Sequence, residues 1–198
     1  KLFRTYLEVS NFSESEKEKT LEALELAIEA HKGQVQKRKK DKEGLDNIPY
    51  SNHPIQVAII ALRDLNMSAE EVQAALLHDV IEDVKELEQD WNTLSIRGVE
   101  SEFSSNTISM VYDCSRGSDV PREDFMEAMK ELTWPSKVIK CLDRLHNLIR
   151  AFSITDVSYI ERYILETKEV YLPAFENMDE LSPVRNLFYD VLSELEKY

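Results

Sequence analysis

The sequence has few of the residues that build tight turns and β-hairpins. Only four of its 198 residues are glycine, and none of them follows Asn or Asp, as the hairpin turns of antiparallel sheets favour. No long stretch alternates apolar and polar residues, which is the pattern of a half-buried strand. Each glycine instead separates two segments with helical periodicity. These absences predict an all-α fold.

Cysteine is equally scarce. The two cysteines, Cys114 and Cys141, lack the close spacing of metal-binding pairs and are too few for a disulfide framework. Structural zinc sites with three or four cysteines are excluded by count. We expect both residues to be small members of the core in a reducing compartment.

Positive charge is also in short supply. The chain carries 24 Lys and Arg against 38 Asp and Glu, which gives a formal net charge of −14. A nucleic-acid interface needs a broad basic patch, so we expect no nucleic-acid partner. No apolar run approaches the length of a membrane span, and the first residues do not resemble a secretory signal. The sequence therefore predicts a cytoplasmic protein with no membrane association.

Helix signals are frequent along the chain. Capping-box patterns, Ser13 with Glu16 and Ser68 with Glu71, mark two helix starts. Prolines suited to a first helical turn occur at positions 54, 135 and 183. No repeat or linker divides the chain. We predict one domain over residues 1–198, built as a helical bundle of roughly eight helices.

The stretch most informative about chemistry is residues 74–84, where four polar side chains interrupt an apolar run: His78, Asp79, Glu82 and Asp83. In one continuous helix, residues four apart share a flank, so His78 lies below Glu82 and Asp79 below Asp83. Burying carboxylates is costly unless a cation or hydrogen-bond donors compensate. The stretch therefore indicates a divalent metal site. A helix end with a satisfied histidine and surface acids is the alternative.

Two other segments can complete such a site. His53 stands just before an expected helix start, where a helix cap is the alternative interpretation. Asp143 interrupts an apolar helix face; it could instead be a buried carboxylate paired with Arg144. Asn147 shares the face of Asp143. We expect His146 to point elsewhere and to be structural.

Together, His53, His78, Asp79 and Asp143 offer two imidazoles and two carboxylates. This donor set suits Mn²⁺, Fe²⁺ or Zn²⁺ with positions left for water and substrate. Glu82 and Asp83, one helical turn from the ligands, are placed to orient that water or to take its proton. A basic loop at residues 37–42 contains five Lys and Arg. It is either a solvated loop or a contact for phosphate or a base.

These segments, in this order, resemble the hydrolase domain of the RelA/SpoT family, within the HD superfamily of metal-dependent phosphohydrolases. The matching segments are residues 30–34, the basic loop, residues 49–58, 74–83 and 140–147, and parts of 163–173. The resemblance implies an all-helical fold with one Mn²⁺ held by His53, His78, Asp79 and Asp143. It also implies that Glu82 and Asp83 serve the attacking water.

The resemblance further implies a substrate. Family members release pyrophosphate from the 3′ position of guanosine tetra- or pentaphosphate, which leaves GDP or GTP. They contact the nucleotide through an Arg-Lys pair, to be found here among Arg38, Lys39 and Lys40, and through the equivalent of Asn147. The absence of synthetase and regulatory domains implies a stand-alone small alarmone hydrolase, and a homo-oligomer is compatible with the sequence.

Two alternatives stay open from the sequence. One is a related phosphohydrolase that acts on another nucleotide, such as a nucleoside monophosphate or the 2′-phosphate of NADPH. The other is a nucleotide sensor that keeps the fold and binds without turnover. The paired acids Glu82 and Asp83 argue against the sensor, because a protein that only binds has no need to activate water.

Overall fold

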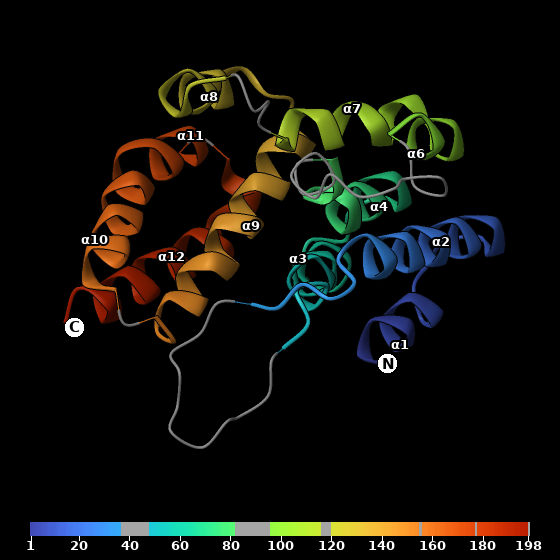
Figure 1. The fold of residues 1–198 in the computed structure, drawn as a ribbon, viewed down its shortest axis with the longest axis horizontal. Helices are drawn as coiled ribbons and strands as arrows, with labels where there is room; N and C mark the ends of the chain where they lie inside the picture. The colour runs from blue at the N-terminus through green and yellow to red at the C-terminus, as the bar shows by residue number, and fades with distance from the viewer. Residues whose placement is uncertain (37–47, 82–95, 116–119, 155, 177, 198) are drawn as a thin grey trace.

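The computed structural model describes residues 1–36, 48–81, 96–115, 120–154, 156–176 and 178–197, and most of these are helical (Figure 1). The first helices are α1 (Leu2–Glu8), α2 (Glu14–Ala30), α3 (Asn52–Arg63) and α4 (Ala69–Leu77). The middle of the chain contains α6 (Ile96–Glu102), α7 (Ser105–Cys114), α8 (Arg122–Ala128), the 3₁₀ turn η1 (Met129–Glu131) and α9 (Trp134–Ala151). The last elements are α10 (Val157–Glu166), the π-helical turn η2 (Thr167–Tyr171), α11 (Leu172–Phe175), the 3₁₀ turn η3 (Asp179–Leu181) and α12 (Ser182–Leu195).

The all-α prediction is confirmed. Within the described ranges no strand forms, and the only β-type pairing is an isolated bridge between Val35 and Pro49. Each helix expected from the sequence has a counterpart, and α1 and α6 are additional short helices. No helix in these ranges combines the length and apolar character that crossing a bilayer requires.

The capping signals act as the sequence indicates. At the start of α2, the Ser13 side chain accepts from the backbone N–H of Glu16, and the Glu16 carboxylate accepts from the N–H of Ser13 at 2.7 Å. Ser68 and Glu71 form the same reciprocal pair at the start of α4. Two orphan N–H groups of each helix are satisfied in this way, which fixes where α2 and α4 begin.

Gly33 shapes the turn that follows α2. Its φ of +82° lies in the left-handed region, and a Cβ built there meets no atom within 4 Å. We expect Gly33→Ala to lower the free energy of unfolding by about 1 kcal/mol, because the strain is in the backbone rather than in packing. Gly33→Asn should lose less, since Asn tolerates this conformation. Urea unfolding measures both, and an alanine variant as stable as the parent would contradict the expectation.

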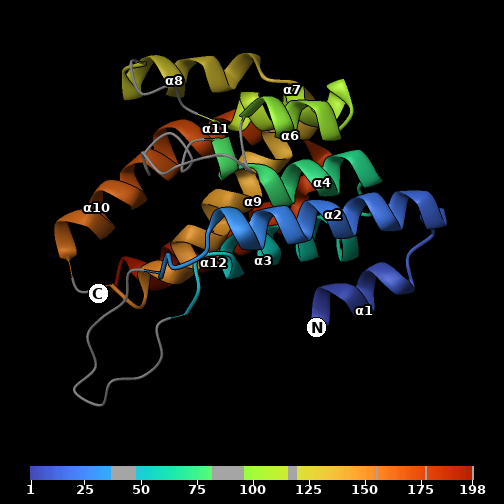
Figure 2. The same cartoon turned by 45° about the vertical axis from the view of Figure 1, so that its right-hand side comes forward.

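Helix α9 lies at the centre of the molecule. In both views it runs between α3, α4 and α7 on one side and α10, α11 and α12 on the other (Figures 1 and 2). The apolar residues on its inner face are buried, and so are three charged ones: Lys140, Asp143 and Arg144. Buried charges need partners at short range. The buried charges on α9 therefore indicate a polar site inside the fold at this helix.

Helix α4 brings the His78 segment to that centre. It packs against α2, α3 and α7, and nearly every residue from Val72 to Leu77 is completely buried. The continuous helix predicted through residue 84 is wrong in one respect, because α4 ends at Leu77 and His78 and Asp79 form a turn. The Nδ1 atom of His78 lies 2.8 Å from the carbonyl oxygen of Ala75 and caps one of the free acceptors at this helix end.

The two cysteines are core residues, as predicted. Cys114 at the end of α7 and Cys141 in α9 are both buried and form no disulfide. Burial raises the pKa of the Cys114 thiol to about 12. A thiol with so high a pKa stays protonated and is a poor nucleophile or metal ligand.

Candidate metal centre

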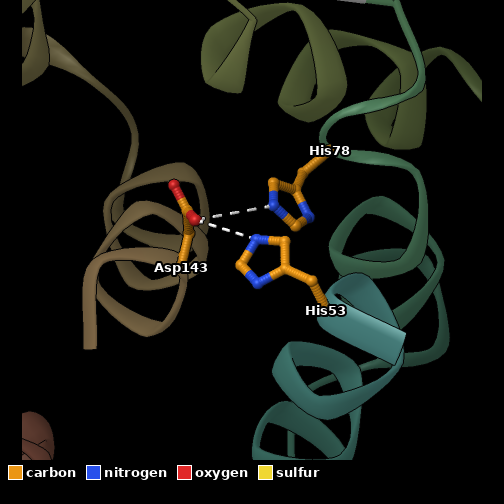
Figure 3. A group of neighbouring side chains, drawn as sticks. All are labelled: His53, His78 and Asp143. Atoms are coloured by element: carbon orange, nitrogen blue, oxygen red, sulfur yellow. Dashed lines mark ion pairs between the residues drawn. The ribbon is translucent and has the colours of Figure 1, made fainter. Parts of the chain in front are cut away.

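Three segments distant in the sequence converge on one point. His53 lies in the first turn of α3, His78 directly follows α4, and Asp143 lies in the middle of α9. Their side chains point toward one another (Figure 3). One nitrogen or oxygen atom from each lies within 4.8 Å of the other two. The Oδ1 atom of Asp143 is 3.1 Å from Nε2 of His53 and 3.8 Å from Nε2 of His78.

Asp79 completes the group. Its Oδ1 atom lies 3.3 Å from Nε2 of His78, and its Oδ2 atom lies 3.4 Å from Nε2 of His53. The turn after α4 therefore supplies two side chains to the cluster. The structure brings together all four residues predicted as ligands, and their binding of a metal stays a prediction.

Each imidazole directs an unbonded nitrogen toward the cluster. His53 and His78 are completely buried, and neither Nε2 atom makes a hydrogen bond to any described group. At His78, Nδ1 is engaged by the Ala75 carbonyl, so a bound cation would displace only the proton on Nε2. Buried polar atoms are nearly always satisfied in native structures. Two buried nitrogens facing two carboxylates fit the donor set of a divalent cation.

The electrostatics of the cluster also favour a positive charge at this point. Burial disfavours the charged form of His78, but Asp79 and Asp143 outweigh burial and raise its pKa to about 10. Burial likewise opposes ionisation of Asp143, but Lys140 and the two histidines hold its pKa well below the usual range. The pKa of Asp79 is also lowered, against burial, chiefly by His78. Both carboxylates are therefore ionised and attract positive charge.

Neighbouring side chains hold the carboxylates in place. The Tyr50 hydroxyl donates to Oδ2 of Asp79 at 2.8 Å, and Nζ of Lys140 donates to Oδ2 of Asp143 at 3.1 Å. Lys140 also donates to the carbonyl of Cys114, at 3.3 Å. Such partners orient metal ligands and tune their basicity. The sequence analysis did not predict this role of Tyr50. The available signal was its position three residues before the predicted ligand His53.

Asn147 and its neighbour sit at the edge of the cluster. The Nδ2 atom of Asn147 donates to Oδ1 of Asp143 at 2.6 Å, and Nη1 of Arg150 donates to Oδ1 of Asn147 at 3.3 Å. The expectation that Asn147 shares the face of Asp143 is confirmed. Its contact with a nucleotide stays a prediction.

The expectation for His146 is wrong. This side chain does not point away from the site, because its Nδ1 atom lies 2.6 Å from Nδ1 of His53. The reason is helical geometry: residues three apart on α9 share a flank, so His146 follows Asp143 toward α3. Burial, together with the nearby His53 and Arg150, lowers the pKa of His146 to about 3.

Arg144 does not pair with Asp143, so that alternative from the sequence is also wrong. Its guanidinium donates to Glu166 at 2.6 Å and lies over the rings of Tyr163 and Tyr171, with 4.2 and 4.3 Å to the ring centroids. Arg144 therefore joins α9 to α10 and η2. The other predicted site residues, Glu82, Asp83, Arg38, Lys39 and Lys40, lie outside the described residues.

The chain is similar to proteins of a recognised family. A family model described as HD domain matches residues 23–174. A rice protein named putative GTP diphosphokinase RSH1, chloroplastic, is 30% identical over 187 residues, which is 88% of this chain but only 19% of the rice protein. The human guanosine-3′,5′-bis(diphosphate) 3′-pyrophosphohydrolase MESH1 is 32% identical over 139 residues, 68% of this chain and 70% of the human one.

Similarity extends to a solved structure. The structure of a metazoan ortholog of SpoT, described as hydrolysing ppGpp, aligns with a TM-score of 0.69 at 21% identity. The alignment covers 89% of this chain and 94% of the other. At this identity the likeness supports the fold alone.

Proposed function

The chain belongs to the HD-domain family, and on that premise we propose that it is a metal-dependent hydrolase of guanosine 3′,5′-bis(diphosphate). The observation that carries the proposal is the buried cluster of His53, His78, Asp79 and Asp143. Relatives about 30% identical are named for this activity, and two of them match over most of their own length. The reaction releases pyrophosphate and leaves GDP, or GTP from the pentaphosphate.

We propose Mn²⁺ as the bound ion. Two imidazole nitrogens and two carboxylates form a mixed donor set that suits Mn²⁺, with Fe²⁺ and Zn²⁺ as the nearest competitors. Such an ion, when bound, lowers the pKa of water and neutralises charge on a phosphate oxygen. The buried, unbonded Nε2 atoms of His53 and His78 support a bound divalent ion.

The residues of the chain supply the remaining parts of the reaction. Water attacks the phosphorus joined to the ribose 3′ oxygen, the bond between that phosphorus and that oxygen breaks, and pyrophosphate leaves. Glu82 and Asp83 accept the proton of the water and return it to the ribose oxygen. Arg38, Lys39 or Lys40, together with Asn147, contact the nucleotide. Lys140 and Tyr50 hold the two carboxylate ligands.

A nucleotide panel tests the proposal. The protein is incubated with Mn²⁺ and, separately, guanosine tetraphosphate, guanosine pentaphosphate, GMP and NADPH, and the products are separated. We expect pyrophosphate from the first two only. Release of orthophosphate from GMP or NADPH would favour the related phosphohydrolase. Tight binding of guanosine tetraphosphate without any product would favour the sensor.

The role of Asp83 gives a separate prediction. We expect Asp83→Asn to bind Mn²⁺ as the parent does but to lose about 10²-fold in turnover, because the amide cannot accept the proton of the attacking water. Steady-state kinetics and Mn²⁺ titration measure the two effects. Asp190→Asn, at an exposed position of α12, is the matched control. Turnover at the parent rate would remove Asp83 from the mechanism.

A further inference from the structure

We propose that His146 is a positioning residue that holds His53 in the tautomer and orientation needed to bind a metal. The inference rests on the proposed metal centre but not on the identity of the nucleotide. It starts from the contact between the two rings, whose Nδ1 atoms lie 2.6 Å apart and whose centroids lie 4.7 Å apart. A separation this short requires a proton on one of the two nitrogens and a lone pair on the other.

The opposite edge of the His53 ring decides which nitrogen carries the proton. Its Nε2 atom faces Oδ1 of Asp143 at 3.1 Å and Oδ2 of Asp79 at 3.4 Å. A metal held between these groups needs the lone pair on Nε2. The proton of the neutral imidazole then sits on Nδ1 of His53 and is donated to His146. His146 must therefore be the acceptor, with its own proton on Nε2.

The two imidazoles of the cluster are anchored in different ways. His78 donates from Nδ1 to the backbone carbonyl of Ala75, and that acceptor is independent of any side chain. His53 relies on the side chain of His146, which comes from another helix, α9. The same helix carries Asp143, three residues earlier. One turn of α9 thus supplies both a candidate ligand and the acceptor that orients another.

Substitutions at position 146 separate this role from a purely structural one. The Asn side-chain oxygen falls near the place of Nδ1 and can accept from His53, so His146→Asn should retain affinity for Mn²⁺. His146→Phe keeps the ring but has no acceptor, and His146→Gln carries its amide near the place of Nε2, away from His53. We expect both to weaken Mn²⁺ binding by about 10- to 100-fold.

The experiment uses the metal alone. Mn²⁺ dissociation constants come from titration followed by electron paramagnetic resonance of the free ion, and nitrogen NMR reports the tautomer of His53 in the parent and variants. Thermal unfolding of each metal-free protein monitors the fold. Ile149→Ala, at an exposed position on the same helix, is the control and should bind Mn²⁺ as the parent does.

The outcomes are distinct. Folded Phe or Gln variants with parental affinity would overturn the inference, and so would an Asn variant that binds as weakly as the other two. If His146→Phe does not fold, the Gln and Asn variants still decide the question. A parent that binds no divalent metal would overturn the metal centre and this inference together, whereas metal binding without hydrolysis of guanosine tetraphosphate would overturn only the proposed substrate.

Discussion

Replacing His78 with Asn is expected to abolish binding of the divalent metal and, with it, hydrolysis, while the fold survives. The Asn side-chain N–H can take over the bond that Nδ1 of His78 makes to the Ala75 carbonyl, so the end of α4 keeps its cap. What disappears is Nε2, which faces Asp79 and Asp143 at 3.3 and 3.8 Å. The contribution of a catalytic metal is several kcal/mol, so we expect at least roughly a 10³-fold loss of turnover.

His78 is a better position for this test than Asp143. Removing the Asp143 carboxylate would also leave Lys140 buried without its partner at 3.1 Å, so a loss of metal could not be separated from a loss of stability. For His78→Asn the measurements are a Mn²⁺ titration, turnover, and thermal unfolding with and without Mn²⁺. Added Mn²⁺ should raise the melting temperature of the parent but not of the variant. A variant that binds Mn²⁺ with parental affinity would contradict the assignment of His78 as a ligand.

Much of the site could be predicted because its residues break local patterns. His78 and Asp79 interrupt an apolar run, and Asp143 interrupts an apolar helix face. Because burying such groups is costly, each needs a partner inside the protein. The helix starts were equally readable, since capping boxes depend on residues only three apart. Local rules fixed these positions without knowledge of the tertiary fold.

The parts that sequence reasoning missed depend on tertiary contacts. The end of α4 at Leu77 reflects a side-chain bond from His78 to a backbone acceptor, which apolar periodicity does not reveal. The Tyr50 hydroxyl reaches a carboxylate 29 residues away, and His146 reaches an imidazole 93 residues away. Helical spacing could place His146 on the flank of Asp143, but only the packing of α9 against α3 shows what it touches.

The contacts of Arg144 in the C-terminal part of the chain could not be predicted from the sequence either. Tyr163 and Tyr171 are eight residues apart, and in an uninterrupted α-helix that spacing rotates them by about 80°. The π-helical turn η2 follows Tyr163 and ends at Tyr171. It rotates the chain less per residue than an α-helix does, so both rings lie over one guanidinium. No simple sequence pattern predicts a π-helical turn. The partner Glu166 is also distant in the sequence, 22 residues from Arg144.

Loss of the Arg144 side chain is therefore expected to destabilise the protein strongly. In Arg144→Met the volume is largely kept, but the partly buried Glu166 carboxylate loses the guanidinium that lies 2.6 Å from it in the parent. Removing one partner of a buried ion pair typically costs about 3–5 kcal/mol. Urea unfolding measures the change, and Arg4→Met, which breaks a largely exposed pair with Glu25, should have little effect.

A second substitution identifies the cause. If the cost of Arg144→Met comes from the carboxylate that has lost this arginine, Glu166→Gln in the same chain should recover part of it, because the amide carries no charge. Equal stability of the single and double variants would instead assign the loss to the contacts with Tyr163 and Tyr171. The folded fraction of Arg144→Met should bind Mn²⁺ as the parent does, since Asp143 is held by Lys140 and Asn147 rather than by Arg144. A large loss of metal affinity in that fraction would mean that the arginine acts on the metal centre and not only on the packing of α9 against α10 and η2.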